Sequence, residues 1–313
     1  MNGIVTKSTG SWYSVRTEEG VIYQCRIPGK FRMKGIKSTN PIAVGDEVIF
    51  ELEPKKETGV VKEIKDRKNV IVRKSVNLSK QTHIIASNID IAFLVVTLHN
   101  PETTTTFIDR FLATAEAYSI KAILLFNKID THDTEMDEYR EAFQYIYTSI
   151  GYECIDVSAI EKINLDVVKN IMKDKVSLFA GHSGVGKSTL VNAIEPTLNL
   201  KTKEISEQHQ QGQHTTTFAE MYPLSFGGYI IDTPGIRGFG VVDFGKYEVT
   251  DYFPELFALK GLCKFNNCTH VEEPKCAVKK ALEEGLVSET RYESYLQLLK
   301  EEEEHYRQDI FKS

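Results

Sequence analysis

A glycine-rich segment of this chain has the composition of a phosphate-binding loop. It fits the pattern G-x-x-x-x-G-K-[ST] and consists of Gly181, His182, Ser183, Gly184, Val185, Gly186, Lys187 and Ser188. An apolar stretch precedes the segment and an apolar-faced run follows, which predicts a strand, a loop and a helix. Backbone N–H groups of such a loop surround phosphate oxygens at a helix N-terminus. We predict that these residues and Thr189 bind nucleotide, with Lys187 at the β- and γ-phosphates and Ser188 on Mg²⁺; the alternative is a glycine-rich turn without a ligand.

A second motif selects the base. Asn127, Lys128, Ile129 and Asp130 follow the apolar run 122–126, so they lie at the carboxyl end of a predicted strand, where open α/β sheets bind ligands. The Asp130 carboxylate can accept two hydrogen bonds from guanine, whereas adenine offers no such pair of donors. We expect Asn127 to face guanine N7 and the Lys128 stem to lie along the ring. The motif favours GTP over ATP and argues against a P-loop kinase or ATPase.

The dipeptide Ser158-Ala159 follows the next predicted strand, 154–157. Alone it carries no information. One strand after the guanine motif, it is typical of GTPases, in which a backbone N–H at this place bonds guanine O6. We therefore include Ser158 and Ala159 in the predicted GTP site.

The third nucleotide motif is D-x-x-G. Asp232 and Gly235 follow the apolar run 229–231, and residues 212–217 read Gly-Gln-His-Thr-Thr-Thr. We predict that Asp232 holds Mg²⁺ through water and that the Gly235 N–H bonds the γ-phosphate. One threonine of 215–217, with Thr216 and Thr217 as candidates, completes the Mg²⁺ shell. The polar run 203–213 is typical of a loop that orders around γ-phosphate.

These motifs appear in an unusual order. Most GTPases run P-loop, switch threonine, D-x-x-G, N-K-x-D and Ser-Ala, whereas here the last two come first. The same sheet can form if the old termini are joined and the chain is reopened after D-x-x-G, since termini often lie close together at the surface. The sequence therefore predicts a circularly permuted GTPase whose mobile loop after Gly235 leads into the C-terminal region.

The residue after D-x-x-G is Ile236, where many GTPases have the glutamine that orients the attacking water. Isoleucine can make no hydrogen bond, so slow intrinsic hydrolysis is expected. His214 is the nearest candidate for the missing group, because histidine suits water positioning near neutral pH. The alternative is a loop histidine without a catalytic role.

A third constellation has metal-ligand spacing. Cys263, Cys268, His270 and Cys276 match a tetrahedral Cys3His zinc site, and four protein ligands leave no open position. We predict one structural Zn²⁺, the alternative being unrelated cysteines near a histidine. The two remaining cysteines, Cys25 and Cys154, are expected to be buried core thiols.

The elements that position these motifs fall into three predicted domains, 1–73, 75–243 and 244–313. The first contains the strand candidates 3–7, 12–16, 21–26, 47–53, 59–64 and 70–73. Five or six short strands predict a small barrel, with an OB-fold as our interpretation and an SH3-like barrel as the rival. The basic loop 29–37 contains Phe31 and could contact phosphates and stack on a base.

The second domain alternates strands and helices. Strands are predicted at 91–97, 122–126, 154–157, 177–180, 218–224 and 229–231, and helices at 105–118, 134–150, 164–172 and 187–194. This alternation predicts a mainly parallel sheet with helices on both faces. The third domain combines the cysteine cluster with a charged, mostly helical tail, in which the acidic run 301–304 is interpreted as a solvated surface.

Composition limits the class of protein. The chain has 313 residues, of which 41% are hydrophobic and 26% charged, with five cysteines and a net charge of −6. Residues 1–80 contain 16 Lys/Arg against 9 Asp/Glu, a balance of +7, which indicates a nucleic-acid partner or a solvated face. The apolar runs fall short of the ~20 residues that cross a bilayer, and no signal peptide is visible. We expect a cytoplasmic protein without membrane contact.

Taken together, these residues resemble the bacterial ribosome small subunit-dependent GTPase family, also called RsgA, YjeQ or YloQ. The resemblance covers the barrel, the permuted GTPase motifs and the C-x4-C-x-H-x5-C spacing; Gln213 departs from it, since we expect a basic residue there. It implies hydrolysis of GTP to GDP, stimulated by the small ribosomal subunit, contact with ribosomal RNA and a role in late maturation of that subunit. We expect a monomer. The alternative is a non-catalytic, GTP-dependent RNA-binding assembly factor.

Overall fold

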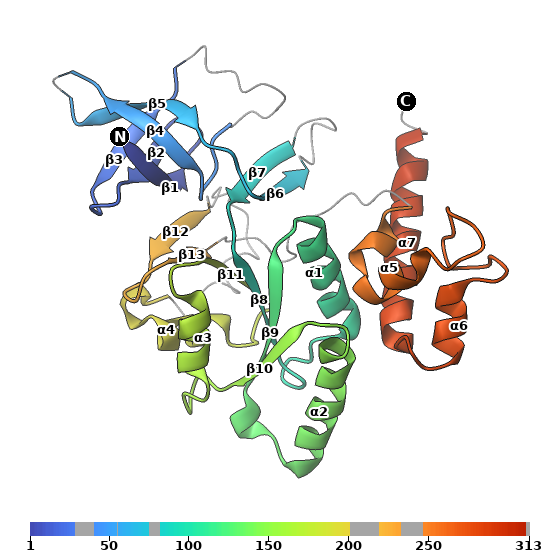
Figure 1. Ribbon diagram of the computed structural model, residues 1–313. Coiled ribbons are helices and arrows are strands. Elements are labelled where there is room, and N and C mark those ends of the chain that lie inside the picture. Colours follow the sequence, from blue (N-terminus) through green and yellow to red (C-terminus); the bar gives the residue numbers. More distant parts are fainter. Residues whose placement is uncertain (29–40, 55, 75–81, 201–218, 233–246, 311–313) are drawn as a thin grey trace.

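The computed structural model describes residues 1–28, 41–54, 56–74, 82–200, 219–232 and 247–310. Three parts lie side by side in Figure 1: a β-barrel at the upper left, an α/β domain in the centre and a helical C-terminal part on the right. Among the described residues, no helix combines the length and the apolar character that crossing a membrane requires.

The N-terminal part is a five-stranded barrel. The strands pair in the order β1-β2-β3-β5-β4, and β4 returns to β1 and closes the barrel. All of these pairs are antiparallel except β3 with β5. This closed Greek-key order is that of an OB-fold, which decides against the SH3-like alternative. The strands are β1 (Asn2–Ser8), β2 (Tyr13–Arg16), β3 (Ile22–Arg26), β4 (Glu47–Leu52) and β5 (Thr58–Ile64).

Of the five or six strands expected for the barrel, the structure has five. Residues 70–73 do form a strand, β6 (Val70–Lys74), but it pairs with β7 (Thr82–Ser87) in a separate two-stranded sheet. Ile71 and Ala86 of this hairpin are buried against the core of the α/β domain. Because apolar alternation reports that one face of a strand is buried, but not against what, the sequence could not choose between the two cores.

The central domain is built on a mainly parallel sheet. Its strand order is β10-β9-β8-β11-β13-β12, in which only β12 runs antiparallel to its neighbour. The edge strand β12 also pairs with β1 of the barrel, so one continuous sheet passes through both parts. The strands are β8 (Ile91–Val96), β9 (Lys121–Asn127), β10 (Glu153–Val157), β11 (Val176–Ala180), β12 (Glu220–Pro223) and β13 (Tyr229–Asp232).

Helices cover both faces of this sheet, as predicted. All six residues of β8 are buried, because alternate side chains enter two different cores. Leu94 packs in the core that includes the helices α1 (Thr105–Ala117) and α2 (Thr134–Thr148). Phe93 and Val95 pack in the core that includes α3 (Leu165–Met172) and α4 (Lys187–Ile194). Short 3-10 turns lie at Ile129–Thr131 and Pro196–Leu198.

The C-terminal part packs against α1. It contains a 3-10 turn at Val249–Tyr252 and the helices α5 (Pro254–Lys260), α6 (Ala277–Glu283) and α7 (Glu289–Ile310). Its core contains Phe253, Leu256 and Tyr295, together with Ala113 of α1. In Figure 1 the helix α1 stands between the sheet and this part, so it contacts both.

Candidate functional site

The predicted phosphate loop connects the end of β11 to the start of α4. Its glycines are required by its geometry. Gly181 and Gly186 have φ values of +141° and +93°, which residues with a side chain rarely adopt. A Cβ on Gly181 would come within 2.6 Å of the Val95 carbonyl oxygen, and one on Gly186 within 2.6 Å of Asn127 Nδ2. Ser183 and Gly184 are exposed, so the loop is accessible to a ligand from solvent.

The loop lysine folds onto the loop itself. Lys187 Nζ donates to the carbonyl oxygens of Gly181 and His182, both at 2.6 Å. Burial lowers the pKa of Lys187. Burial, followed by the neighbouring Lys187 charge, also lowers the pKa of His182. The cation is thus held beside the loop backbone, where it can reach an anion bound to the loop N–H groups.

The fold brings the predicted guanine motif directly against this loop. Asn127 Nδ2 donates to Val185 O at 2.8 Å, and Lys128 Nζ donates to Gly184 O at 2.9 Å. Lys128 also donates to Asn100 O at 2.6 Å and has a left-handed backbone, with φ of 69°. Two segments that are far apart in sequence are therefore joined by side chain to backbone bonds.

The next two predicted base-binding segments also meet. The strands β9 and β10 are parallel neighbours, with Asn127 opposite Val157, so both chains leave the sheet at the same edge. Ser158 Oγ donates to Asp130 Oδ1 and accepts from Glu161 N at 3.0 Å. Ser158 is buried, whereas Asp130 is exposed. The Asp130 carboxylate is thus oriented by the protein and still faces solvent, and Ala159 directly follows Ser158 in the chain.

The predicted magnesium and switch residues are described only in part. Ser188 is in the first turn of α4, and the backbone of Asp232 ends β13, the parallel neighbour of β11. The Asp232 side chain lies outside the description, as do His214, Gly235, Ile236 and the threonines 215–217. The roles of these residues remain predictions, and so does that of the basic loop 29–37.

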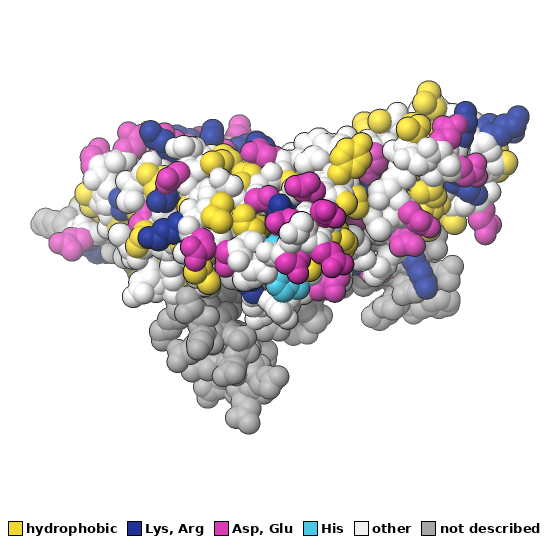
Figure 2. Space-filling model, turned by 90° about the horizontal axis from the view of Figure 1, so that it is seen from below, with side chains coloured by type: hydrophobic (Ala, Val, Ile, Leu, Met, Phe, Trp, Pro, Cys, Tyr) yellow, Lys and Arg dark blue, Asp and Glu magenta, His cyan; other side chains and the backbone are white. Residues whose placement is uncertain are grey.

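The surface around the base-binding motif is acidic. Figure 2, the view from below, shows Asp and Glu side chains gathered around histidine at the lower end of the α/β domain. Asp130 and Asp133 are exposed, and Asp133 Oδ1 accepts from Met136 N at 2.9 Å at the start of α2. Because these carboxylates repel an anion, this part of the surface disfavours a phosphate group.

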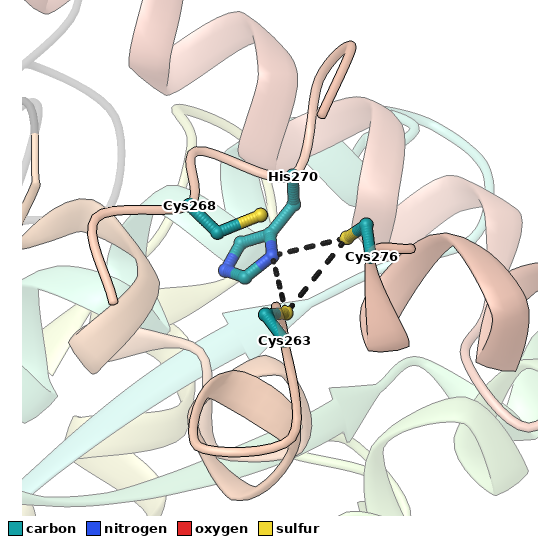
Figure 3. A group of neighbouring side chains, drawn as sticks. All are labelled: Cys263, Cys268, His270 and Cys276. Atoms are coloured by element: carbon teal, nitrogen blue, oxygen red, sulfur yellow. Dashed lines mark hydrogen bonds between the residues drawn. The ribbon is translucent and has the colours of Figure 1, made fainter. Parts of the chain in front are cut away.

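The predicted metal ligands come together in the C-terminal part. The ligand atoms of Cys263, Cys268, His270 and Cys276 all lie within 4.8 Å of one another. His270 Nδ1 is 3.3 Å from Cys276 Sγ and 3.6 Å from Cys263 Sγ, and the two sulfurs are 4.0 Å apart (Figure 3). Zinc bonds of about 2.3 Å to sulfur and about 2.0 Å to nitrogen place tetrahedral ligands about 3.5–3.8 Å apart. The cluster is therefore compatible with zinc.

Surrounding residues hold this cluster in shape. Backbone N–H groups of Ala277 and Lys279 donate to the sulfurs of Cys263 and Cys276, at 3.4 and 3.5 Å. On α7, Tyr292 and Tyr295 donate to the carbonyl oxygens of His270 and Thr269. The Glu273 carboxylate accepts from the N–H groups of Thr269 and Val271, at 2.7 and 3.0 Å. Donors aimed at sulfur favour thiolates, which are the form that binds zinc.

Sequence reasoning missed two contacts of the nucleotide loop. One is the Asn100 carbonyl, which accepts from Lys128, and the other is Phe107, whose ring lies against His182. A signal for the first was present, since Asn100-Pro101 is a turn dipeptide at the carboxyl end of β8, the strand next to β11. Phe107 had no such signal, because an aromatic residue in a helix is most simply interpreted as core.

Comparison with known proteins agrees with this architecture. The family model "RsgA N-terminal domain" matches residues 2–61, and the model "RsgA GTPase" matches residues 64–242. The chain is 63% identical to a relative from Flavobacterium psychrophilum, covering 99% of this chain and 96% of the relative. It is 54% identical to one from Bacteroides fragilis, covering 97% and 98%. Both are named small ribosomal subunit biogenesis GTPase RsgA.

Two solved structures share the fold. One is YjeQ from Thermotoga maritima, with a TM-score of 0.77 at 34% identity, covering 96% of this chain and 97% of that one. The other is YloQ, described as a circularly permuted GTPase, with a TM-score of 0.76 at 31% identity, covering 97% and 95%. The predicted permuted GTPase fold is thereby confirmed. The chain therefore belongs to the RsgA family of GTPases, enzymes that hydrolyse GTP.

Proposed function

We propose that this protein binds the small ribosomal subunit and hydrolyses GTP during the late maturation of that subunit. The observation that supports the nucleotide site best is the contact of Asn127 and Lys128 with the backbone of the phosphate loop. A base held by one segment and phosphates held by the other would lie across this junction. The names of the full-length relatives support the choice of the small subunit.

In this proposal Asp130 selects guanine. Its carboxylate accepts hydrogen bonds from the ring N–H and the exocyclic amine, while Ser158 keeps it oriented. The backbone N–H that follows, at Ala159, bonds guanine O6. Adenine would leave the carboxylate unpaired, which is the physical basis of the preference for GTP over ATP.

The phosphates are held by the loop and by α4. The N–H groups of 181–189 and the Lys187 ammonium bind the β- and γ-phosphates, and the Gly235 N–H bonds the γ-phosphate. Ser188, Asp232 and one of Thr216 and Thr217 are the residues proposed to hold Mg²⁺, which neutralises charge on the phosphates. No residue becomes covalently bonded to phosphate.

Positioning of the attacking water needs a group other than Ile236. We propose His214, whose neutral imidazole can accept a hydrogen bond from the attacking water near neutral pH. An alanine at 214 would lower kcat while leaving the affinity for GTP nearly unchanged, because the residue acts on the nucleophile and not on the nucleotide. Equal turnover by wild type and His214→Ala would exclude this role.

The two flanking parts are proposed to contact the ribosome. The barrel, within 1–73, contains most of the excess positive charge and would bind ribosomal RNA. The C-terminal part, 244–313, would be folded around one structural Zn²⁺, and the GTPase domain would span 75–243. We propose that the protein is a monomer that works in the cytoplasm.

Base selection is tested with Asp130→Asn. Competition of GTP and ATP against a fluorescent GDP should show loss of GTP preference by about 100-fold or more, since an amide in place of the carboxylate cannot accept both guanine N–H bonds. The matched control is Glu135→Gln, which removes an exposed carboxylate from the nearby first turn of α2. Unchanged selectivity in Asp130→Asn would refute the guanine site.

Ribosome binding is tested by cosedimentation. The protein with a non-hydrolysable GTP analogue should pellet with small ribosomal subunits and less so with GDP. Large subunits serve as the control. Equal pelleting with both subunits would point to nonspecific RNA binding by the basic barrel.

A further inference from the structure

The helix α1 reaches the phosphate loop through one aromatic contact. The ring of Phe107 lies over the ring of His182, with centroids 3.7 Å apart and planes tilted by 32°. Phe107 is in the first turn of α1, where its backbone N–H is capped by Thr104 Oγ1 at 3.3 Å. The cap fixes the start of the helix and so places Phe107 in the turn that faces the loop.

This contact falls on a residue that matters for the phosphates. The His182 carbonyl is one of the two oxygens that accept from Lys187 Nζ. A shift of the His182 ring moves its backbone and with it the acceptor of the loop lysine. Burial, followed by the Lys187 charge, lowers the pKa of His182, which favours the uncharged form of the ring. Phe107 therefore acts on the loop without touching the ligand.

Two residues further along, α1 is anchored in the C-terminal part. Asp109 is fully buried, and Arg291 Nη1 of α7 donates to its Oδ1 at 2.9 Å. Arg291 also donates through Nε and Nη2 to Glu255 of α5, at 2.7 and 3.1 Å, and lies 4.6 Å over the Phe253 ring. The guanidinium is 1% exposed. A buried charge with this many partners has one favourable position, so it sets where α1 lies relative to α7.

We propose that Phe107 is a positioning residue for the phosphate loop, held in place from the C-terminal domain by Arg291 through Asp109 and α1. This inference rests on the proposed nucleotide site and adds a series of contacts that connects the C-terminal part to the phosphate loop. These contacts are separate from the covalent connection that runs from Gly235 to the C-terminal region. If Phe107 positions the loop in this way, the position of the C-terminal part affects the affinity for nucleotide.

The test uses Phe107→Leu in the full-length protein, which keeps apolar volume but removes the ring. Because the variant loses the aromatic interaction with His182, KM for GTP and Kd for fluorescent GDP should rise about 2- to 10-fold. We expect kcat to change less than about twofold, because no reacting group is touched. Phe107→Tyr should restore both constants, a rescue that general destabilisation would not show.

The matched control is Arg110→Ala. Arg110 directly follows the anchor residue Asp109 on α1, is exposed, and pairs with Glu301 of α7. It thus joins the same two helices outside the buried network, and its loss should leave KM and Kd unchanged. An equal rise in Arg110→Ala would attribute the effect to loosened helix packing and overturn the proposal.

A double-mutant cycle gives a second readout that does not depend on a single variant. His182→Gln removes the partner ring, and Phe107→Leu combined with it should bind GDP no worse than either single variant. Asp109→Asn should raise Kd in the wild-type background and add nothing to Phe107→Leu. Additive effects, or an unchanged Kd, would contradict the proposal. GDP affinity remains the readout if the protein fails to hydrolyse GTP, so failure of the proposed function is distinguishable.

Discussion

The two parts that flank the GTPase domain are attached to it in different ways, although each attachment contains a buried Asp–Arg pair. On the barrel side, Asp46 accepts from Arg67, from Ser87 Oγ and from Ala43 N. On the other side, Asp109 accepts from Arg291 through Oδ1, while Oδ2 has no hydrogen-bond partner among the described residues. Both oxygens of the Asp46 carboxylate thus accept hydrogen bonds, whereas only one oxygen of Asp109 does so among the described residues.

The two attachments also differ in whether backbone hydrogen bonds take part. The barrel shares a sheet with the GTPase domain through β1 and β12, and the chain continues into the hairpin β6–β7, whose side chains enter the central core. The C-terminal part meets α1 through side chains of α7 and the turn at Val249–Tyr252. Burial raises the pKa of Asp109 in spite of Arg291, which shows how poorly this carboxylate is solvated. The barrel attachment therefore includes backbone pairing between strands, whereas the C-terminal attachment consists of side-chain packing around the buried Arg291.

Metal removal should have the largest effect and should be confined to one side. Structural zinc contributes about 10–16 kcal/mol of apparent binding free energy, so chelation should unfold the C-terminal part before the GTPase sheet. Hydrogen exchange measured by mass spectrometry should show fast exchange in α5, α6 and α7 and unchanged strands β1–β5. Cys276→Ser should behave likewise, while Cys154→Ala, outside the cluster, should retain one zinc per chain. Uniform melting would remove the distinction between the two sides.

Arg291→Met should have the next largest effect. Removal of one partner leaves the Asp109 carboxylate buried and unpaired, which costs about 3–5 kcal/mol. Arg110→Met breaks the exposed pair with Glu301 between the same helices and should cost about 0–1 kcal/mol. Urea unfolding followed by exchange in α7 measures both. Similar losses in the two variants would mean that helix packing, and not the buried arginine, holds the C-terminal part.

Ser87→Ala tests the barrel attachment. The change removes one of several donors to Asp46, so we expect a loss of about 1 kcal/mol, well below that of Arg291→Met. Thermal unfolding monitored by circular dichroism gives the comparison. A loss as large as that of Arg291→Met would show that the barrel, too, depends on a single contact.

The exposed ion pair between the barrel and β12 should contribute little. Lys7 and Glu220 are 3.4 Å apart with side chains 44% and 35% exposed, so Lys7→Glu should cost less than about 1 kcal/mol. Addition of Glu220→Lys should restore the pair and recover that loss. Detachment of the barrel in Lys7→Glu would increase the radius of gyration in small-angle X-ray scattering. That result would show that this pair holds the interface together.

The smallest effect concerns acid within the barrel. Hydrogen bonds from Arg26 and Thr58 lower the pKa of Glu53 to about 2. Because this pKa lies below the ordinary value of about 4.3, the stabilisation is fully present above pH 4.3 and is lost as pH falls toward 2. Carboxyl chemical shifts should report this titration, and Glu53→Gln should remove it. A midpoint near 4.3 would show that the contacts do not persist in solution.

The nucleotide junction could be predicted from sequence because one rule places it. Motifs that follow apolar strands come to the carboxyl edge of a parallel sheet, so Asn127, Ser158 and Gly181 had to be neighbours. The zinc ligands are near in sequence, and their spacing alone brings them together. The alternation of apolar strands and helices made the α/β fold predictable, and the run of short strands did so for the barrel, whereas the pairing of β6 was not predictable.

The attachment of the C-terminal part could not be predicted. Asp109 and Arg291 lie 182 positions apart, and each stands in a helix where a charged residue is ordinarily interpreted as solvated. Only tertiary packing buries them. The strand β7 and the helices α5 and α6 were missed because short elements have weak periodicity, and the helices lie beside metal ligands that dominated the interpretation.

We propose that this GTPase acts on the small ribosomal subunit, and its rate of GTP turnover is the decisive measurement. GTP hydrolysis by the purified protein is measured alone, with small subunits and with large subunits. We predict slow intrinsic turnover, strong stimulation by small subunits and none by large ones. Stimulation by both subunits alike, or by neither while GTP is still bound, would contradict the account.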